Sequence, residues 1–151
     1  MRPDALKLAG QYRCGPHTAK QRRGDEIALL LPLYVADTEA EAQRVPRDSV
    51  MHYFDVVARR VVAGDAELDA ATRERKREMQ ARLQRLTFEE VRENMAIIGP
   101  PEHCIERIAG LREEFQLSEL ICWFNPGGLL SSETVLTSMH RFATHVMPHF
   151  H

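Results

Sequence analysis

Residues 27–41 read IALLLPLYVADTEAE, and this stretch decides the fold class. The segment from Ile27 to Ala36 is an almost unbroken apolar run, which is typical of a strand buried on both faces. A parallel sheet covered by helices requires such burial. Thr38, with Glu41 three residues later, forms a capping-box pattern, so a helix follows the strand almost without a loop. The sequence therefore predicts an α/β protein with a parallel sheet.

A second buried strand is predicted near the other end of the chain, where residues 119–124 read ELICWF. Because helical segments separate the two runs, we predict that Ile27–Val35 and Leu120–Phe124 are parallel strands of one sheet. Pro32 interrupts the first run and cannot donate an N–H to a ladder. It predicts either a bulge or a strand that pairs only in part.

Helices fill most of the chain between these strands. The segment Glu67–Leu86 is charged and contains no Gly or Pro, which indicates a surface helix with a solvated face. Thr87 and Glu90 open another short helix as a capping box. Residues 96–99 are either a brief strand or a buried loop, and Pro101 stands where the next helix begins. A last helix is expected to begin at a cap formed by Ser131 or Ser132 and to end at Pro148. Three helices have apolar residues at helical spacing, which predicts their inward faces: Val50, Phe54, Val57 and Val61 in the first; Cys104, Ile108, Leu111 and Phe115 in the second; Val135, Met139, Phe142 and Val146 in the last.

Bulk properties narrow the class of protein. The chain has 151 residues and a net charge of −2, so no strong field is expected and neither nucleic acid nor a membrane is a predicted partner. Its three cysteines, at positions 14, 104 and 122, are odd in number and widely spaced, which argues against a disulfide framework. We expect a cytoplasmic protein with reduced cysteines. Residues 1–26 are polar and rich in turn residues, and are expected to form an irregular lead-in.

Four pieces of sequence, in order, resemble the closing part of luciferase-like, flavin-dependent monooxygenases. The junction Tyr34–Ala42 is similar to that family's Tyr-Val-Ala-x-Thr-x-x-Glu-Ala segment. Residues 98–102, IGPPE, resemble its Gly-x-Pro-Glu helix start. The strand that ends before Asn125–Gly128 resembles its strand and Gly-Gly turn. Residues 142–148, FATHVMP, resemble its Phe-Ala-x-x-Val-x-Pro signature.

The resemblance implies a (β/α)8 TIM barrel that uses reduced flavin, usually FMN and in some relatives a deazaflavin. Such enzymes insert one oxygen atom from O2 into a small organic substrate, and a flavin reductase would be the partner that supplies the reduced flavin. A complete barrel takes about 250 residues, so the expectation here is a partial barrel, with C-terminal strands and helices only, over residues 27–151. The missing part would hold most of the flavin-phosphate contacts, and no Gly-rich fingerprint or P-loop replaces them. Pro100 also stands where the family usually offers a hydroxyl or acidic cap.

Three residues after the second strand are candidates for cofactor binding. Active sites of barrel enzymes lie at the carboxyl ends of the strands, so Asn125, Gly127 and Gly128 are predicted to line the flavin pocket. The alternative is a plain turn between a strand and a helix. Trp123 and Tyr34 are open to both a cofactor contact and a core position. No catalytic residue is assigned.

Four histidines near the C-terminus invite a metal hypothesis: His140, His145, His149 and His151. Only the middle two have helical i, i+4 spacing, a proline interrupts them, and no acidic ligand is close in sequence. We therefore predict no metal site.

The rival hypothesis is a non-catalytic α/β module or a truncated subunit that pairs with another chain. Unpaired strand edges would then favour self-association or pairing with a missing barrel half.

Overall fold

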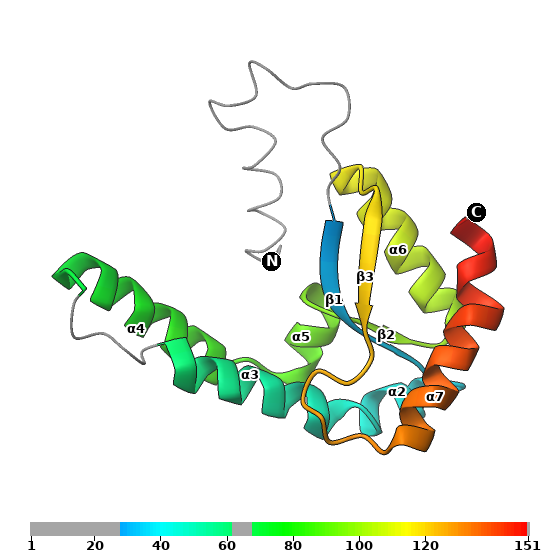
Figure 1. The fold of residues 1–151 in the computed structure, drawn as a ribbon, viewed down its shortest axis with the longest axis horizontal. Coiled ribbons are helices and arrows are strands. Elements are labelled where there is room, and N and C mark those ends of the chain that lie inside the picture. Colours follow the sequence, from blue (N-terminus) through cyan, green and yellow to red (C-terminus); the bar gives the residue numbers. More distant parts are fainter. Residues whose placement is uncertain (1–27, 62–67, 151) are drawn as a thin grey trace.

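The computed structural model describes residues 28–61 and 68–150, so the predicted lead-in over residues 1–26 lies outside the described part of the chain (Figure 1). Strands and helices alternate in the predicted order. The elements are β1 (Ala28–Val35), α2 (Glu39–Arg44), α3 (Arg47–Val61), α4 (Ala70–Gln84), α5 (Phe88–Asn94), β2 (Ile97–Gly99), α6 (Pro101–Phe115), β3 (Glu119–Trp123) and α7 (Ser132–Arg141), followed by a π-helical turn (Phe142–Val146) and a 3-10 turn (Met147–Phe150).

The three strands form one parallel sheet in the order β2-β1-β3. The prediction that the first and last apolar runs are parallel strands is confirmed, because Ala28–Pro32 pairs with Glu119–Trp123. Leu33–Val35 pairs instead with β2. Pro32 lies where β1 changes from one neighbour to the other, and its pairing keeps a one-to-one register. The predicted partial pairing is therefore what occurs, and there is no bulge at this proline.

The strand order places β1 in the middle of the sheet. In a (β/α)8 barrel consecutive strands are neighbours and all helices lie on the outside. Here β1 and β3 pair directly, and helices cover both faces of the sheet. The described sheet thus establishes a parallel α/β fold, and the barrel remains an expectation from the family.

Each face of the sheet has its own hydrophobic core. One core joins Leu31, Leu33 and Val35 of β1 to the inward face of α6, and all four residues predicted for that face are buried. The other core lies under α2, α3 and α5 and contains Tyr34 and Ile98. Alternate residues of β1 thus enter opposite cores, as the two-residue period of a strand requires. The continuous apolar run arises from this burial on both sides.

Local capping sets the helix starts as predicted. Thr87 and Glu90 form a complete capping box at α5. Thr38 accepts from the Glu41 N–H at α2, but the Glu41 carboxylate accepts from the Asp37 N–H rather than from Thr38. Pro100 precedes α6 and makes no side-chain cap, as its chemistry requires.

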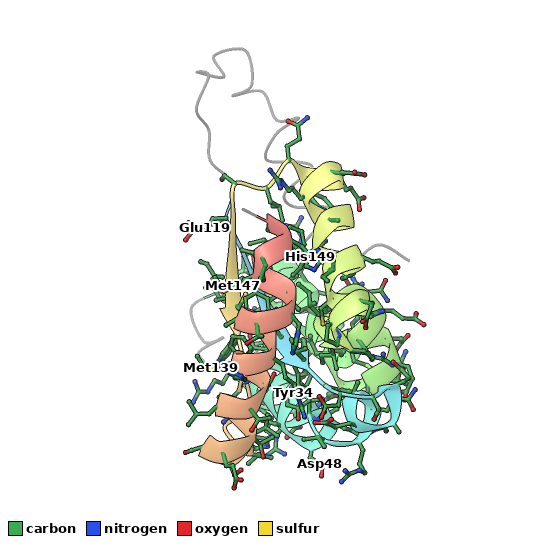
Figure 2. All side chains as sticks on the ribbon, turned by 90° about the vertical axis from the view of Figure 1, so that its right-hand side faces the viewer. Tyr34, Asp48, Glu119, Met139, Met147 and His149 are labelled. Carbon is green, nitrogen blue, oxygen red and sulfur yellow. The ribbon has the colours of Figure 1, made fainter. Side chains whose placement is uncertain are left out.

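The last helix differs from its prediction in two ways. Met139 was expected to face inward but is 43% exposed, whereas Ser138 is fully buried. The cause is a hydrogen bond of 2.8 Å from the Val35 N–H to the Ser138 hydroxyl, which turns Ser138 toward the sheet. Figure 2 places Met139 and Met147 on the side of this segment that faces away from α6. The α-helix ends at Arg141, and Pro148 lies inside the 3-10 turn instead of ending the α-helix.

Helix α4 projects from the rest of the fold (Figure 1). It begins after the N-cap Asp69 and has no buried residue, which confirms the prediction of an exposed, charged helix in this part of the chain. The predicted pair of Glu74 and Arg77 is present at 3.7 Å between exposed groups. None of the helices in the described ranges is long and apolar enough to cross a bilayer.

Candidate functional site at the carboxyl ends of the strands

The carboxyl ends of β1 and β3 meet at one edge of the sheet because the strands are parallel and adjacent. After β1, the chain continues into α2 and α3, which cover the core on one face of the sheet. After β3, it continues into α7 and the turn Phe142–Val146, and Val146 is buried in the core on the opposite face. In open α/β sheets, ligands bind at carboxyl ends where connections diverge to the two faces. This edge is therefore the candidate functional site.

An ion-pair network closes one side of this edge. We call Tyr34, Asp37, Glu41 and Arg141 the Arg141 network. The Tyr34 hydroxyl donates to Glu41 Oε1 at 2.9 Å, and Arg141 Nη1 donates to the same oxygen at 2.8 Å. Arg141 is also ion-paired with Asp37. The network joins β1 and α2 to the last helix, 100 residues later in the chain.

Burial and hydrogen bonding set the protonation states in this network. Burial, together with the hydrogen bond to Glu41, raises the pKa of Tyr34 to about 12, so the phenol stays neutral and donates. Burial alone would raise the pKa of Glu41, but hydrogen bonds from the Asp37 N–H, Arg141 and Tyr34 outweigh it and lower the pKa. Glu41 is consequently a fixed carboxylate whose oxygens already accept hydrogen bonds, which suits a structural clamp better than a proton-transfer role.

Asn125 shapes the turn on the other side of the edge. Its Oδ1 accepts from the Ser49 hydroxyl at 2.9 Å and from the Leu130 N–H at 3.2 Å, and its Nδ2 donates to the Leu130 carbonyl oxygen at 3.2 Å. Ser49 is buried near the start of α3 and also accepts from the Leu129 N–H. Asn125 thus holds the loop before α7 against α3, and one hydrogen of its amide remains for a further acceptor.

The two glycines of this turn have different environments. A Cβ on Gly127 would lie 1.8 Å from the Ser49 carbonyl oxygen, so only glycine allows this close approach of the loop to α3. Gly128 is exposed and has a φ of 73°, the left-handed region that glycine adopts without strain. Of the three predicted site residues, Gly127 is thus required for the close packing of the loop against α3, whereas the backbone of Gly128 is exposed to solvent.

An apolar patch of the sheet lies next to this turn. Register places Leu30 beside Ile121 and Pro32 beside Trp123 on one face. Leu30 is 50% exposed and Ile121 is 44% exposed, so none of the described helices covers this part of the face. Trp123 meets the edge of the Tyr53 ring at 4.7 Å between centroids. We call Leu30, Ile121 and Trp123 the open sheet face.

The two aromatic residues left open by the sequence take different places. Tyr34 is buried in the core under α3, where its hydroxyl serves the Arg141 network. Trp123 is half-buried at the end of β3 and contacts Tyr53, so both of its predicted roles stay open.

Arginines near this edge are engaged in ion pairs. Arg92 binds the Glu39 carboxylate and donates from Nε to the Ile98 carbonyl oxygen at 2.9 Å. Arg47 pairs with Glu89 at 2.6 Å. Arg141 is also ion-paired. These three guanidinium groups therefore stabilise the fold, and they are not available to bind a phosphate group.

Sequence reasoning missed Ser49 and Arg141. Nothing in the local pattern around Ser49 indicates that its hydroxyl meets Asn125, 76 residues later. Glu41 was identified, but only as a helix cap. The capping pattern indicates where its backbone lies and carries no information about a distant arginine.

The two described cysteines, one buried and one half-buried, are unreactive thiols. Cys104 and Cys122 are free, and Cys14 lies outside the described residues. Burial raises the pKa of Cys104 to about 12 and that of Cys122 to about 11. In the described ranges, no three His, Cys, Asp or Glu side chains come together in a way that could hold a metal ion.

Comparison with known proteins places this arrangement in a family. The family model for luciferase-like monooxygenases matches residues 15–116, which is about two thirds of the chain. The match includes β1, the helices that follow it, β2 and all of α6, but ends before β3 and its turn. No curated protein matches the chain. The predicted family is confirmed: the chain belongs to the luciferase-like monooxygenases.

Proposed function

We propose that this protein serves a flavin-dependent monooxygenase reaction, in which one oxygen atom from O2 enters a small organic substrate. The match of residues 15–116 to the luciferase-like family carries this proposal. When bound, the reduced flavin supplies the oxygen chemistry, and the protein supplies position and a dry environment. FMN is the cofactor we favour, with a deazaflavin as the alternative.

The carboxyl edge fits the ring system of a flavin better than its phosphate. A flat aromatic ring requires apolar and aromatic neighbours, and the open sheet face beside Tyr53 offers both. A phosphate requires free cations or unpaired N–H groups. Arg92 and Arg141 are ion-paired, and the Gly128 N–H already donates to the Asn125 carbonyl oxygen at 3.2 Å.

We assign three residues to the ring. Trp123 would pack against it, the free amide hydrogen of Asn125 would donate to a ring acceptor, and the exposed backbone of Gly128 would allow close approach. Gly127 would act indirectly, by holding the turn against Ser49. The phosphate contacts would come from further barrel strands, to which residues 27–151 contribute the C-terminal part of the domain.

The source of the reduced flavin and the cellular compartment are proposed from the family alone. The reduced flavin would come from a separate reductase, and the protein would work in the cytoplasm.

A non-catalytic α/β module is the second candidate, and the strand order favours it. Direct pairing of β1 with β3 leaves no place between them for β2, which a barrel would require. Two cores, one on each face, give the sheet much of the burial that a self-sufficient module requires.

The fluorescence of Trp123 tests the proposal, because this residue is the only tryptophan in the chain. We expect added FMN to shorten the Trp123 lifetime in a saturable manner. The lifetime is the quantity to measure, since absorption of light by FMN does not alter it. The midpoint should lie in the range of about 1 mM, because a flavin held by one wall of a pocket recovers little of its ordering cost.

A variant that moves the tryptophan provides the control. Trp123→Phe/Met79→Trp places the probe at the exposed Met79 of α4, a helix that projects away from the strands (Figure 1). This probe should show only the linear quenching of random collisions. Equal, linear quenching of both probes would reject a flavin site at Trp123 and leave the non-catalytic module.

A further inference from the structure

Helix α4 lacks the packing that normally stabilises a helix. It has 15 residues, and none of them is buried. Among the described elements, α3 is the only one with which it makes extensive contact. A helix that is polar on all sides requires a partner or many side-chain pairs along its length. Glu74 and Arg77 form one such pair at 3.7 Å between well-exposed groups, a geometry of little energetic value, and Lys76 and Arg82 have interactions of their own.

The charge of α4 indicates what kind of partner it would accept. Residues 70–84 contain five basic and two acidic side chains, a net charge of +3, whereas the whole chain has −2. The remainder of the protein therefore carries −5. Arg73, Arg75 and Arg77 are all exposed. The partner surface should consequently be acidic.

A matching acidic stripe lies on α6. Glu102, Glu106 and Glu113 are spaced by four and seven residues, which places them on one side of the helix. All three are exposed, and among residues 28–61 and 68–150 none of them forms an ion pair. The inward side of α6 is already buried in the core by Cys104 and Leu111, so the acidic stripe faces solvent.

We propose that α4 of one copy binds the acidic stripe on α6 of a second copy. The two helices lie at opposite ends of the molecule, so they cannot meet within one chain (Figure 1). In a two-fold symmetric pair, each copy provides one α4 and one α6, and the contact forms twice. This interface is independent of the flavin site and of the open sheet face.

A second copy accounts for the charges better than a nucleic acid does. A phosphate backbone would be attracted to α4 but repelled by the net charge of −5 on the remainder. A second copy instead brings its acidic α6 to α4. The attraction at the two α4–α6 contacts then offsets the repulsion between the negatively charged remainders of the two copies. Because the pairs are exposed, salt should weaken the association strongly.

Charge reversal with rescue is the decisive test. Light scattering on the full chain should give a dimer at about 50 mM NaCl and a shift toward monomer at about 500 mM. Arg73→Glu/Arg75→Glu/Arg77→Glu and, separately, Glu106→Arg/Glu113→Arg should each weaken the dimer at least about tenfold. A mixture of these two variants should form a heterodimer, because one α4–α6 contact then joins reversed charges of opposite sign.

Glu93→Arg is the matched control, since Glu93 is exposed on α5 and lies outside the stripe. It should leave the dimer constant within about twofold. Far-UV circular dichroism should show folded protein for every variant. A monomer at low salt, association that only added nucleic acid produces, or a dimer lost by Leu30→Asp and insensitive to the α4 and α6 reversals would each overturn the proposal.

Discussion

Replacing Gly127 by alanine is expected to destabilise the protein by about 3 kcal/mol, at the upper end for overpacking of a close contact. The added Cβ would lie 1.8 Å from the Ser49 carbonyl oxygen, which is backbone and cannot rotate away. The loop would have to leave α3, and the hydrogen bonds of Asn125 and Leu129 to the Ser49 hydroxyl would be lost with it. Urea unfolding followed by circular dichroism measures the effect.

Gly110→Ala is the matched control for this substitution. Gly110 lies within α6, and an added Cβ would meet nothing within 4 Å. Alanine in an open helix position should raise stability by about 0.5–1 kcal/mol. If both variants lost stability equally, the close contact between the turn and α3 would not be the cause.

Replacing Arg141 by methionine is expected to destabilise the protein by about 2 kcal/mol at neutral pH, the scale of a hydrogen-bonded charge left without its partner. The substitution keeps the aliphatic stem but removes both ion pairs of the network. Glu41, which is largely shielded from solvent, would remain charged beside the Tyr34 hydroxyl. Arg59→Met removes an exposed pair with Asp55 and should change stability by less than about 0.5 kcal/mol.

The pH dependence of this effect has a defined sign. The pKa of Glu41 is lower in the folded protein than its ordinary value of 4.5, so the folded state favours the carboxylate. That stabilisation is present above pH 4.5 and is lost as the pH falls through the lowered pKa. The difference between wild type and Arg141→Met should therefore shrink as the pH falls below 4.5. A constant difference from pH 7 to pH 3 would show that the network does not depend on the charge of Glu41.

The sequence predicts most of the local structure because local signals carry it. Continuous apolar runs identify β1 and β3, and the Thr87–Glu90 box marks the start of α5. The four apolar positions of α6 predict its buried face because helical spacing suffices there. Helical spacing does not predict the buried face of the last helix. The Ser138 hydroxyl accepts a hydrogen bond from the Val35 N–H of the sheet, so Ser138 is buried and its neighbour Met139 is exposed.

The strand order and the site geometry depend on contacts that local patterns do not encode. The β2-β1-β3 order depends on which strand fills each side of β1, and both neighbours are apolar. Asn125, Gly127 and Gly128 were placed correctly at the carboxyl end of β3, but the partner of the first two, Ser49, is distant in sequence. Their assignment to the flavin stays a prediction.

A 15N-resolved NMR titration with FMN tests the central claim, a flavin site at the carboxyl edge, most directly. We expect the Gly128 and Leu129 amides and the Trp123 indole N–H to shift and saturate at about millimolar FMN, while Gly110 in α6 stays unchanged. Inorganic phosphate alone should not reproduce these shifts. Unchanged signals at the turn and Trp123 at saturating FMN, or shifts confined to other parts of the chain, would contradict the account.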